Sequence, residues 1–263
     1  MLFQAFAAVL SGALSGFVLG LIGGGGSVLA TPLLLYFVGV ASPHVALGTG
    51  ALAVSLNAFA NLAGHARKGH VLWRCATVFS IFGMVGAYLG STLGKLIDGN
   101  QLLLLFGFAM VAVGASMLRP RKLMPGECPP ITRLSCVRAA GMAVLAGAAS
   151  GFFGIGGGFL IVPALILATG MATINAVGSS LMAVGVFGLT TAVNYAASGL
   201  VDWLVAAEFL AGGLLGGLAG LTLAGHLSAN KNALNRIFAV IVFVVAAYVL
   251  YRSGSALVMA VPA

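Results

Sequence analysis

The chain contains 263 residues, of which 61% are hydrophobic and 6% are charged, and its mean hydropathy is +1.15. A soluble domain carries about 25% charged residues, so this composition excludes a water-soluble globule and indicates a membrane protein. The net charge of +8 comes from Lys and Arg residues that lie largely in short loops between apolar runs. That pattern is typical of orientation signals beside a cytoplasmic membrane surface and argues against a nucleic-acid partner.

Apolar runs long enough to span a bilayer, which takes about 20 residues, occur at 2–22, 45–64, 71–94, 101–118, 137–153, 174–197, 203–225 and 233–251. The first run lacks a basic N-terminal region and a small-residue cleavage site, so we expect a membrane helix and not a signal peptide. Two shorter runs, 28–40 and 159–169, follow glycine clusters. Because backbone groups in lipid need internal partners, we predict an all-α polytopic membrane protein with about eight long transmembrane helices and two short broken or re-entrant helices.

The two halves of the sequence resemble each other. Residues 20–32 align with 151–163, and after the loss of one residue 46–49 align with 176–179 and 69–73 with 199–203. This register predicts an internal duplication: repeat 1 at 1–118, a cytoplasmic linker at 119–136, repeat 2 at 137–252 and a short tail at 253–263.

Equivalent loops of the two repeats carry different charge, which bears on their relative orientation. Arg67, Lys68 and Arg74 lie in one loop, whereas the matching loop carries only Asp202. Under the positive-inside rule this contrast slightly favours inverted repeats and leaves a parallel arrangement open. Inversion requires an odd number of crossings in each half, so that the glycine cluster turns the chain back.

The glycine clusters are the strongest candidates for a binding site. Glycine is unfavourable inside a helix, and broken helices at matching places of two repeats are typical of transporter binding sites. Ser27 is expected to cap a helix that begins near Val28, and Phe159 to begin its counterpart. Two such helix starts could bind an anion through free N–H groups. The candidate substrate-binding residues in the clusters are Gly23, Gly24, Gly25, Gly26, Ser27, Gly154, Gly156, Gly157 and Gly158.

The same glycines could instead only permit close contact between helices. We favour this second interpretation for Gly86, Gly90, Gly216 and Gly220.

Hydroxyl and amide side chains extend the candidate site. Thr49, Ser179 and Ser180 lie at the start of the next helix in each half, where they could bind oxyanions or bond to their own helix. Five further polar residues could line a cavity or could equally form hydrogen bonds between helices. They are Asn57, Asn61, Thr190, Thr191 and Asn194.

Few acidic or catalytic groups lie inside the predicted spans. No Asp or Glu occupies the middle of a span, which favours an anion over a cation as solute, and Glu208 is a possible proton relay. His65 and His70 flank basic residues at a spacing that does not place them on one helical face, so we do not expect them to be ligands. We expect no enzymatic activity, cofactor or metal site, and the oligomeric state is not predicted.

Several of these motifs resemble the sulfite exporter TauE/SafE family of bacterial membrane permeases. They are the glycine clusters at 20–26 and 151–158, the Pro that follows each, the Ala-x-Gly-Thr/Ser helix starts, and the Gly-x-x-x-Trp loops. The resemblance covers about 6–252 and implies a secondary transporter of the bacterial inner membrane. The implied solutes are sulfur-containing anions such as sulfite or organosulfonates, moved by export. Ile155 interrupts the second cluster, which departs from the first.

The alternatives are an anion channel, an uptake permease for another small organic anion, and a membrane scaffold without transport activity. A carrier should show saturable flux and counter-exchange, whereas a channel should not.

We predict that Gly25→Val or Gly157→Val abolishes anion transport while the protein still inserts, because a branched side chain would occupy the backbone break. Flux into proteoliposomes, together with the yield of inserted protein, measures both quantities. Normal transport by both variants would show that the clusters are not the binding site.

Overall fold

The computed structural model describes residues 2–118, 133–154, 158–169, 171, 173–226 and 242–252, and its regular structure in these ranges is helical. The tail at 253–263 and most of the predicted linker lie outside the described residues. Helices long and apolar enough to cross a membrane are found at Phe3–Leu21, Pro43–Arg67, Trp73–Leu96, Ile174–Ala196 and Trp203–Leu223. Shorter apolar helical stretches are found at Gly26–Tyr36, Gly99–Ala112, Ala139–Phe152 and Val242–Arg252, of which the second and third are parts of helices that are 20 residues long. The predicted all-α polytopic class is confirmed, with five long helices among the described residues where the sequence suggested about eight.

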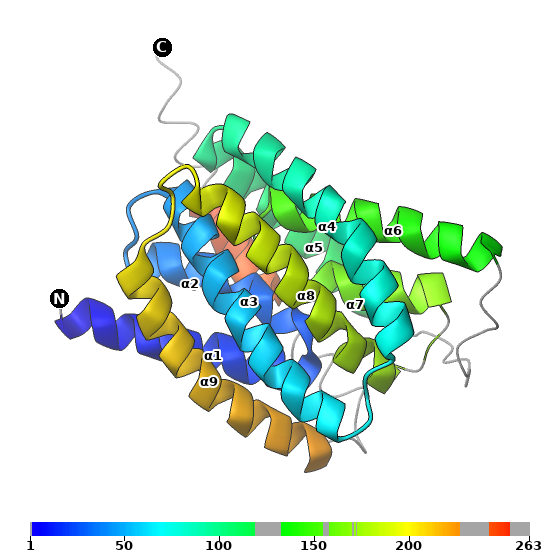
Figure 1. Cartoon of the computed structure of the whole chain (residues 1–263). Coiled ribbons are helices and arrows are strands. Elements are labelled where there is room, and N and C mark those ends of the chain that lie inside the picture. Colours follow the sequence, from blue (N-terminus) through cyan, green and yellow to red (C-terminus); the bar gives the residue numbers. More distant parts are fainter. Residues whose placement is uncertain are drawn as a thin grey trace.

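In chain order the elements are α1 (Leu2–Ile22), the 3₁₀ helix η1 (Gly24–Leu29), α2 (Ala30–Tyr36), α3 (Pro43–Arg67), α4 (Trp73–Leu96), α5 (Gly99–Leu118), α6 (Arg133–Phe152), α7 (Gly158–Thr169), α8 (Thr173–Ala196) and α9 (Trp203–His226). The helix Val242–Arg252 follows and is called the terminal helix below. Figure 1 shows their arrangement.

The first glycine cluster forms a tight helical turn. Gly23 adopts φ 76°, a left-handed conformation that glycine tolerates without strain, and the 3₁₀ helix begins directly after it. Ser27 therefore lies inside η1, and no side chain caps this helix. The prediction that Ser27 caps a helix starting near Val28 is wrong, because the glycines themselves enter the helical turn. Gly154 adopts a similar conformation, with φ 63°, before α7.

Glycines allow two pairs of helices to pack with their backbones in contact. In α1, Gly12, Gly16 and Gly20 lie against the backbone carbonyls of Phe209, Gly213 and Gly217 of α9. Both series of numbers rise together, so α1 and α9 are parallel. The pair α4 and α6 is also parallel, since the carbonyls of Val144 and Ala148 lie against Gly86 and Gly90. The predicted packing role of Gly86, Gly90, Gly216 and Gly220 is confirmed.

The helices α3 and α8 run antiparallel through the centre of the bundle (Figure 1). The Ser55 hydroxyl donates to the Gly185 carbonyl at 2.8 Å, and Gly48 contacts the Tyr195 side chain. In α3 and α8, 72% of the most apolar stretch of the helix is buried inside the protein, against 44–50% in α1, α4 and α9. On one side α3 packs on α9 and α1, and on the other α8 packs on α4 and α6.

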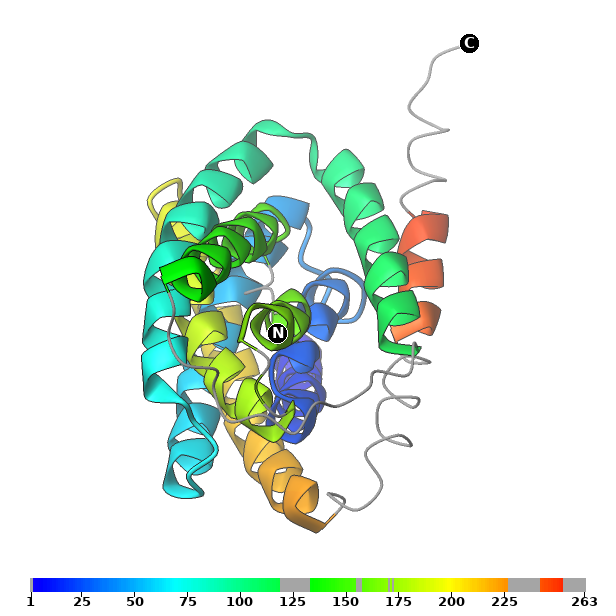
Figure 2. The ribbon, with the colours of Figure 1, turned by 90° about the vertical axis from the view of Figure 1, so that its right-hand side faces the viewer.

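The terminal helix packs against α5 at the edge of the bundle (Figure 2). Leu250 contacts Gly107, and Phe243 contacts Gly114, so the two helices are antiparallel. Phe106 and Met110 of α5 form a buried cluster with Val242 and Ala246, and this cluster includes Val28 of η1.

Two hydrogen bonds join the loops of one half to the central helix of the other. The Leu72 N–H donates to Ser179 Oγ at 3.0 Å, and the Asp202 N–H donates to Thr49 Oγ1 at 2.9 Å. Leu72 and Asp202 directly precede α4 and α9, so each hydroxyl fixes the start of a neighbouring helix. The residues of the two bonds correspond to each other in the sequence alignment of the halves.

The two ends of the bundle differ in charge. The basic end, where α3 ends and α4 and α8 begin, carries Arg67, Lys68 and Arg74. The opposite end, where α3, α5 and α9 begin, carries both signs of charge, with Lys95, Asp98, Asp202 and Arg252. Trp73 and Trp203 are exposed and lie at the starts of α4 and α9, one at each end. Tryptophan at both ends of a bundle is typical of the two membrane–water interfaces.

We expect Gly147→Ala to destabilise the protein by about 1–3 kcal/mol, because the added methyl group would overlap the Gly83 carbonyl of α4. Gly141→Ala in the same helix is the matched control, since a side chain there would meet no atom within 4 Å. Thermal unfolding in detergent measures the difference. Equal melting temperatures for the two variants would contradict the proposed backbone contact.

We expect Thr49→Val and Ser179→Ala each to destabilise the fold by about 1–3 kcal/mol, because each leaves a backbone N–H without its partner. Thr49→Ser should retain most of the stability. Thr222→Val is the control, because the exposed Thr222 hydroxyl donates only to Ala219 of its own helix. The same unfolding assay applies. Losses of stability no larger than that of Thr222→Val would show that these two hydroxyls do not hold the starts of α9 and α4 in place.

Candidate functional site

The structure places Gly23 of the first glycine cluster and Gly154 of the second near opposite ends of the bundle. A Cβ at Gly23 would contact Val177 near the start of α8, whereas one at Gly154 would contact Leu47 near the start of α3. These antiparallel helices have 24 and 25 residues, and Val177 and Leu47 each lie about one turn inside a helix start, so the two contacts are roughly 25 Å apart at 1.5 Å per residue. Gly23 and Gly154 therefore lie well apart along the axes of the central helices. The rest of the first cluster comes closer to the second half of the chain, because η1, which contains Gly24, Gly25 and Gly26, packs on α7.

The structure describes only part of the clusters. Gly24, Gly25 and Gly26 belong to η1, and the Ser15 hydroxyl of α1 donates to the Gly26 carbonyl at 3.0 Å. Ser27 and Gly158 are buried. Gly156 and Gly157 lie outside the described residues.

The candidate hydroxyls at the helix starts are buried and engaged with the protein. Thr49 and Ser179 accept the two cross-half hydrogen bonds described above, and the Ser180 hydroxyl donates to the Val177 carbonyl at 2.8 Å. A hydroxyl that accepts from the backbone still has its own proton. Thr49 and Ser179 can therefore donate to a solute oxygen without losing their structural bonds, which is chemically compatible with a binding role.

A stripe of buried polar side chains follows α3 along the face that contacts α1 and α9. We call Asn57, Asn61 and His65 the α3 stripe; they are spaced four residues apart, which places them on one face of a helix. Each is at most 5% exposed. The Asn61 side-chain amide donates to the backbone carbonyl of Asn57 at 2.9 Å. The side-chain oxygen of Asn57, Oδ1, is buried and has no partner among the described residues. A buried amide oxygen without a partner is costly, so the α3 stripe is the strongest candidate for contact with a polar solute.

The glycines of α1 and α9 make room for this stripe. Gly213 lies against the Asn57 side chain, and Gly20 and Gly217 lie against the Asn61 side chain. Larger residues at these places would displace the amides. The glycines that bring α1 and α9 together therefore also allow the amides to lie between three helices.

The matching face of α8 is largely apolar. It carries Phe187, Thr191 and Tyr195, and Phe187 stacks on Phe79 of α4 at a centroid distance of 6.2 Å. Thr191 Oγ1 and the Tyr195 hydroxyl are buried and without partners in the described part of the chain. Thr191 is therefore buried on a face of α8 whose other two residues are aromatic, and its role as a cavity-lining residue stays a prediction.

Asn194 and Thr190 lie on a different face of α8, toward α4. Together with Tyr88, Leu189, Val193 and Ala197 they line a surface groove of about 410 Å³. The Lys95 ammonium donates to Asn194 Oδ1 at 2.8 Å and to Ser198 Oγ at 2.9 Å, and the Asn194 amide donates to Ser91 Oγ at 2.7 Å. The Thr190 hydroxyl donates to its own helix. The structure therefore places these two residues at a helix–helix contact and not with the α3 stripe.

Sequence reasoning missed the proximity of His65 and His70. Gly69 adopts φ 71° and turns the chain back after α3, so that the two rings lie 5.9 Å apart at the basic end. His70 Nδ1 is buried without a partner among the described residues, and the buried His65 imidazole lies beside the Gly20 backbone of α1. Gly69 was the signal in the sequence for this reversal of the chain, because a helix often ends at a glycine in the left-handed conformation.

The buried polar side chains of α3 can form hydrogen bonds with a polar solute. The described residues contain no group of three His, Cys, Asp or Glu side chains that could hold a metal ion. Glu208 is half-buried in α9. The buried polar groups offered by α3 are amides, hydroxyls and imidazoles, which can bind a solute and exchange it without forming a bond.

Comparison with known proteins identifies the family. The chain is 60% identical over 94% of its length, and 95% of the relative's, to a probable membrane transporter protein of Xylella fastidiosa. It is 28% identical over 81% of its length, and 85% of the relative's, to the probable membrane transporter protein YunE of Bacillus subtilis. No solved structure matches the chain. The model of the sulfite exporter TauE/SafE family matches residues 8–249, and the chain therefore belongs to this family of membrane transporters.

Proposed function

We propose that the chain is a secondary transporter that exports small sulfur-containing anions, such as sulfite or organosulfonates, across a bacterial inner membrane. The observation that carries the proposal is the α3 stripe, whose buried Asn57 Oδ1 has no partner among the described residues. An unsatisfied amide oxygen in one of the two most enclosed helices costs stability, and this cost would be relieved if the Asn57 amide contacted a polar solute. The family and the names of the relatives agree with transport.

An anionic solute is supported by the donors that the site offers. The Asn57 and Asn61 amides and the Thr49 hydroxyl are donors on one helix, and no carboxylate lies beside them in the sequence of α3. Asn57 can present its amide N–H or its carbonyl, according to the rotation of the amide group. Sulfite and sulfonates carry several acceptor oxygens and need such donors.

We further propose that the protein consists of two inverted repeats that move by alternating access. The proposal is supported by the antiparallel course of α3 and α8, which correspond to each other in sequence, and by the paired hydrogen bonds at Thr49 and Ser179. The glycine contacts tie α1 to α9 and α6 to α4, so each tightly packed pair combines both sequence halves. The moving units would then be two mixed groups, α1–α3–α9 and α4–α6–α8, sliding at the contact of α3 with α8.

The orientation and the coupling ion follow from charge. The positive-inside rule would place the basic end in the cytoplasm. Proton coupling is a proposal that involves Glu208 and the pair His65 and His70, because these are the titratable groups near the α3 stripe and in α9. A channel or an uptake permease for another organic anion remains the alternative, and the flux assay below separates them.

We expect Asn57→Leu and Asn57→Asp to reduce sulfite or sulfonate flux by about tenfold or more, because the first removes a donor and the second repels an anion. Labelled sulfite and a panel of sulfonates are assayed in proteoliposomes, with and without a pH gradient. Leu56→Ala is the matched control, because Leu56 is 39% exposed on the same helix.

Each arm of this experiment has a defined outcome. Saturation and counter-exchange are expected of a carrier, and flux that shows neither would indicate a channel. Variants must first give the monodisperse elution and melting temperature of folded protein. Folded Asn57→Leu that transports at the rate of the Leu56→Ala control would remove the α3 stripe from the proposal.

A further inference from the structure

A second buried polar group lies where α8 ends, at the end of the bundle opposite the basic end. Tyr195 is fully buried there, and its hydroxyl has no partner among the described residues. The side chain packs beside Gly48 of α3, where an added Cβ would lie 2.9 Å from the Tyr195 Cβ. Tyr195 shares a buried cluster with Leu47 and Leu102, and Leu47 also lies against Gly154. Tyr195 and the second glycine cluster therefore share a neighbour in α3.

Packing alone does not explain a tyrosine at this position. A buried tyrosine hydroxyl usually finds a hydrogen-bond partner, and one without a partner costs stability. Phe187, two turns earlier in α8, is equally buried and carries a ring without a hydroxyl. A phenylalanine at position 195 would bury the same ring without this cost. A ligand that accepts a hydrogen bond from the Tyr195 hydroxyl would relieve the cost.

A second group without a partner lies beside Tyr195. His44 is in the first turn of α3, and its ring centroid is 6.4 Å from that of Tyr195. His44 Nδ1 is buried and has no partner in the described part of the chain. A neutral imidazole can carry its proton on Nδ1 and donate it, as a phenol can donate its own. These two side chains, called the Tyr195–His44 pair below, bring two unused hydrogen-bonding groups together from antiparallel helices.

Lys95 supplies positive charge beside the pair. Its ammonium lies 6.0 Å from the centroid of the Tyr195 ring. It donates to neutral oxygens of Asn194 and Ser198 at 2.8–3.1 Å. These three bonds use the three N–H groups of the ammonium, so Lys95 would act on an anion through its charge and not as a donor.

Two carboxylates at the same end are held at helix starts. One oxygen of Asp98 accepts from the Asn100 N–H in the first turn of α5 at 2.9 Å. One oxygen of Asp202 accepts from the N–H groups of Leu204 and Val205 in the first turn of α9 at 3.1 Å. Each carboxylate is therefore directed at the start of its own helix, where the helix dipole stabilises its charge.

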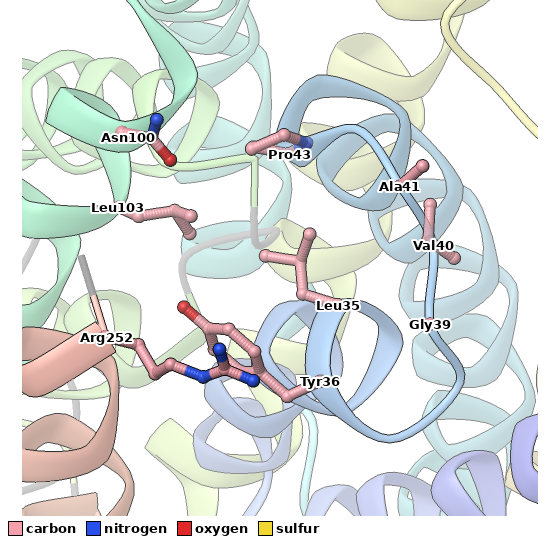
Figure 3. Close-up of a pocket in the computed structure, with 9 residues that line it drawn as sticks. All are labelled: Leu35, Tyr36, Gly39, Val40, Ala41, Pro43, Asn100, Leu103 and Arg252. Carbon is pink, nitrogen blue, oxygen red and sulfur yellow. The ribbon is translucent and has the colours of Figure 1, made fainter. Parts of the chain in front are cut away.

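A surface hollow lies close to the pair. It has a volume of about 370 Å³ and opens between the C-terminal end of α2, the start of α5 and the terminal helix (Figure 3). Pro43 and Leu103 line it, and the residues next to them in the chain, His44 and Leu102, contact Tyr195 or belong to its cluster. A small displacement of the start of α3 would therefore connect the hollow with the pair.

We infer that the Tyr195–His44 pair is a second binding position for a small oxyanion that bears an apolar group, such as an alkyl sulfonate. The Tyr195 hydroxyl would donate to a sulfonate oxygen, and Leu47 and Leu102 would contact the carbon end. The position is separate from the α3 stripe, which lies against α1 and α9. That the bound anion is also the transported solute rests on the function proposed above, whereas binding can be measured without transport.

The test is a thermal-shift titration of the full-length protein in detergent with methanesulfonate, against sodium chloride of equal ionic strength. We expect methanesulfonate to raise the melting temperature of the wild type. Tyr195→Phe should melt no lower than the wild type without ligand, because it removes a hydroxyl that has no partner, and should weaken the apparent affinity by about tenfold. Tyr251→Phe is the matched control, because Tyr251 is 76% exposed in the terminal helix.

A second variant tests the other member of the pair. His44→Phe keeps a ring beside Tyr195 and removes Nδ1, so we expect the apparent affinity to fall by about threefold or more. A purely structural role of the Tyr195 hydroxyl would have the opposite signature in Tyr195→Phe, namely a lower melting temperature and an unchanged response to methanesulfonate. If Tyr195→Phe does not fold, His44→Phe decides by the same titration.

The outcomes separate this inference from the proposed function. A wild type that methanesulfonate does not stabilise, or folded Tyr195→Phe that responds as Tyr251→Phe does, overturns the second binding position. Tyr195-dependent binding by a wild type that transports no sulfonate supports the position and defeats the transporter proposal. Sulfonate flux that depends on Asn57, together with binding that Tyr195→Phe leaves unchanged, does the reverse.

Discussion

The close approach of helix backbones at glycine is the constraint on which the rest of the structure depends. In a lipid bilayer the hydrophobic effect does not drive apolar helices together, because lipid tails are as apolar as the helices. Helix association therefore relies on van der Waals contact and on hydrogen bonds. Gly16 in α1 and Gly147 in α6 each lie against a carbonyl of the partner helix. Two parallel pairs, α1 with α9 and α4 with α6, result from these contacts. They enclose α3 and α8, which are the helices that carry most of the buried polar groups.

This packing constrains the alternating-access motion proposed above. Because each glycine-packed pair takes one helix from each sequence half, such a motion would have to move the mixed groups α1–α3–α9 and α4–α6–α8 and not the two sequence halves. The two groups meet where α3 contacts α8, through Phe59 against Gly185 and through the hydrogen bond of the Ser55 hydroxyl to the Gly185 carbonyl. The cross-half hydrogen bonds at Thr49 and Ser179 lie at the two ends of this contact. They hold the loops before α9 and α4 to the helix beside which those elements begin.

The sequence predicted the helical class, the glycine breaks and the family, because composition and motifs are local properties. It predicted the packing role of Gly86 and Gly90 for the same reason. It could not predict which faces of α3 and α8 turn inward, so Asn57 and Asn194 were placed in one group although they lie on different contacts. It also treated both glycine clusters as one site, because a linear alignment shows equivalence but not that Gly23 and Gly154 lie near the starts of two antiparallel helices.

The two central helices differ at corresponding positions. Positions 57, 61 and 65 carry Asn, Asn and His on α3, whereas the corresponding positions 187, 191 and 195 carry Phe, Thr and Tyr on α8. These side chains do not face each other across the contact of α3 with α8, because Asn57 and Asn61 lie against glycines of α1 and α9, whereas Phe187 lies against Gly83 and Phe79 of α4. A buried amide needs a hydrogen-bond partner, whereas a buried aromatic ring needs only close packing. The group α1–α3–α9 therefore carries a demand for hydrogen-bond partners that the group α4–α6–α8 does not carry at the matching positions 187 and 57.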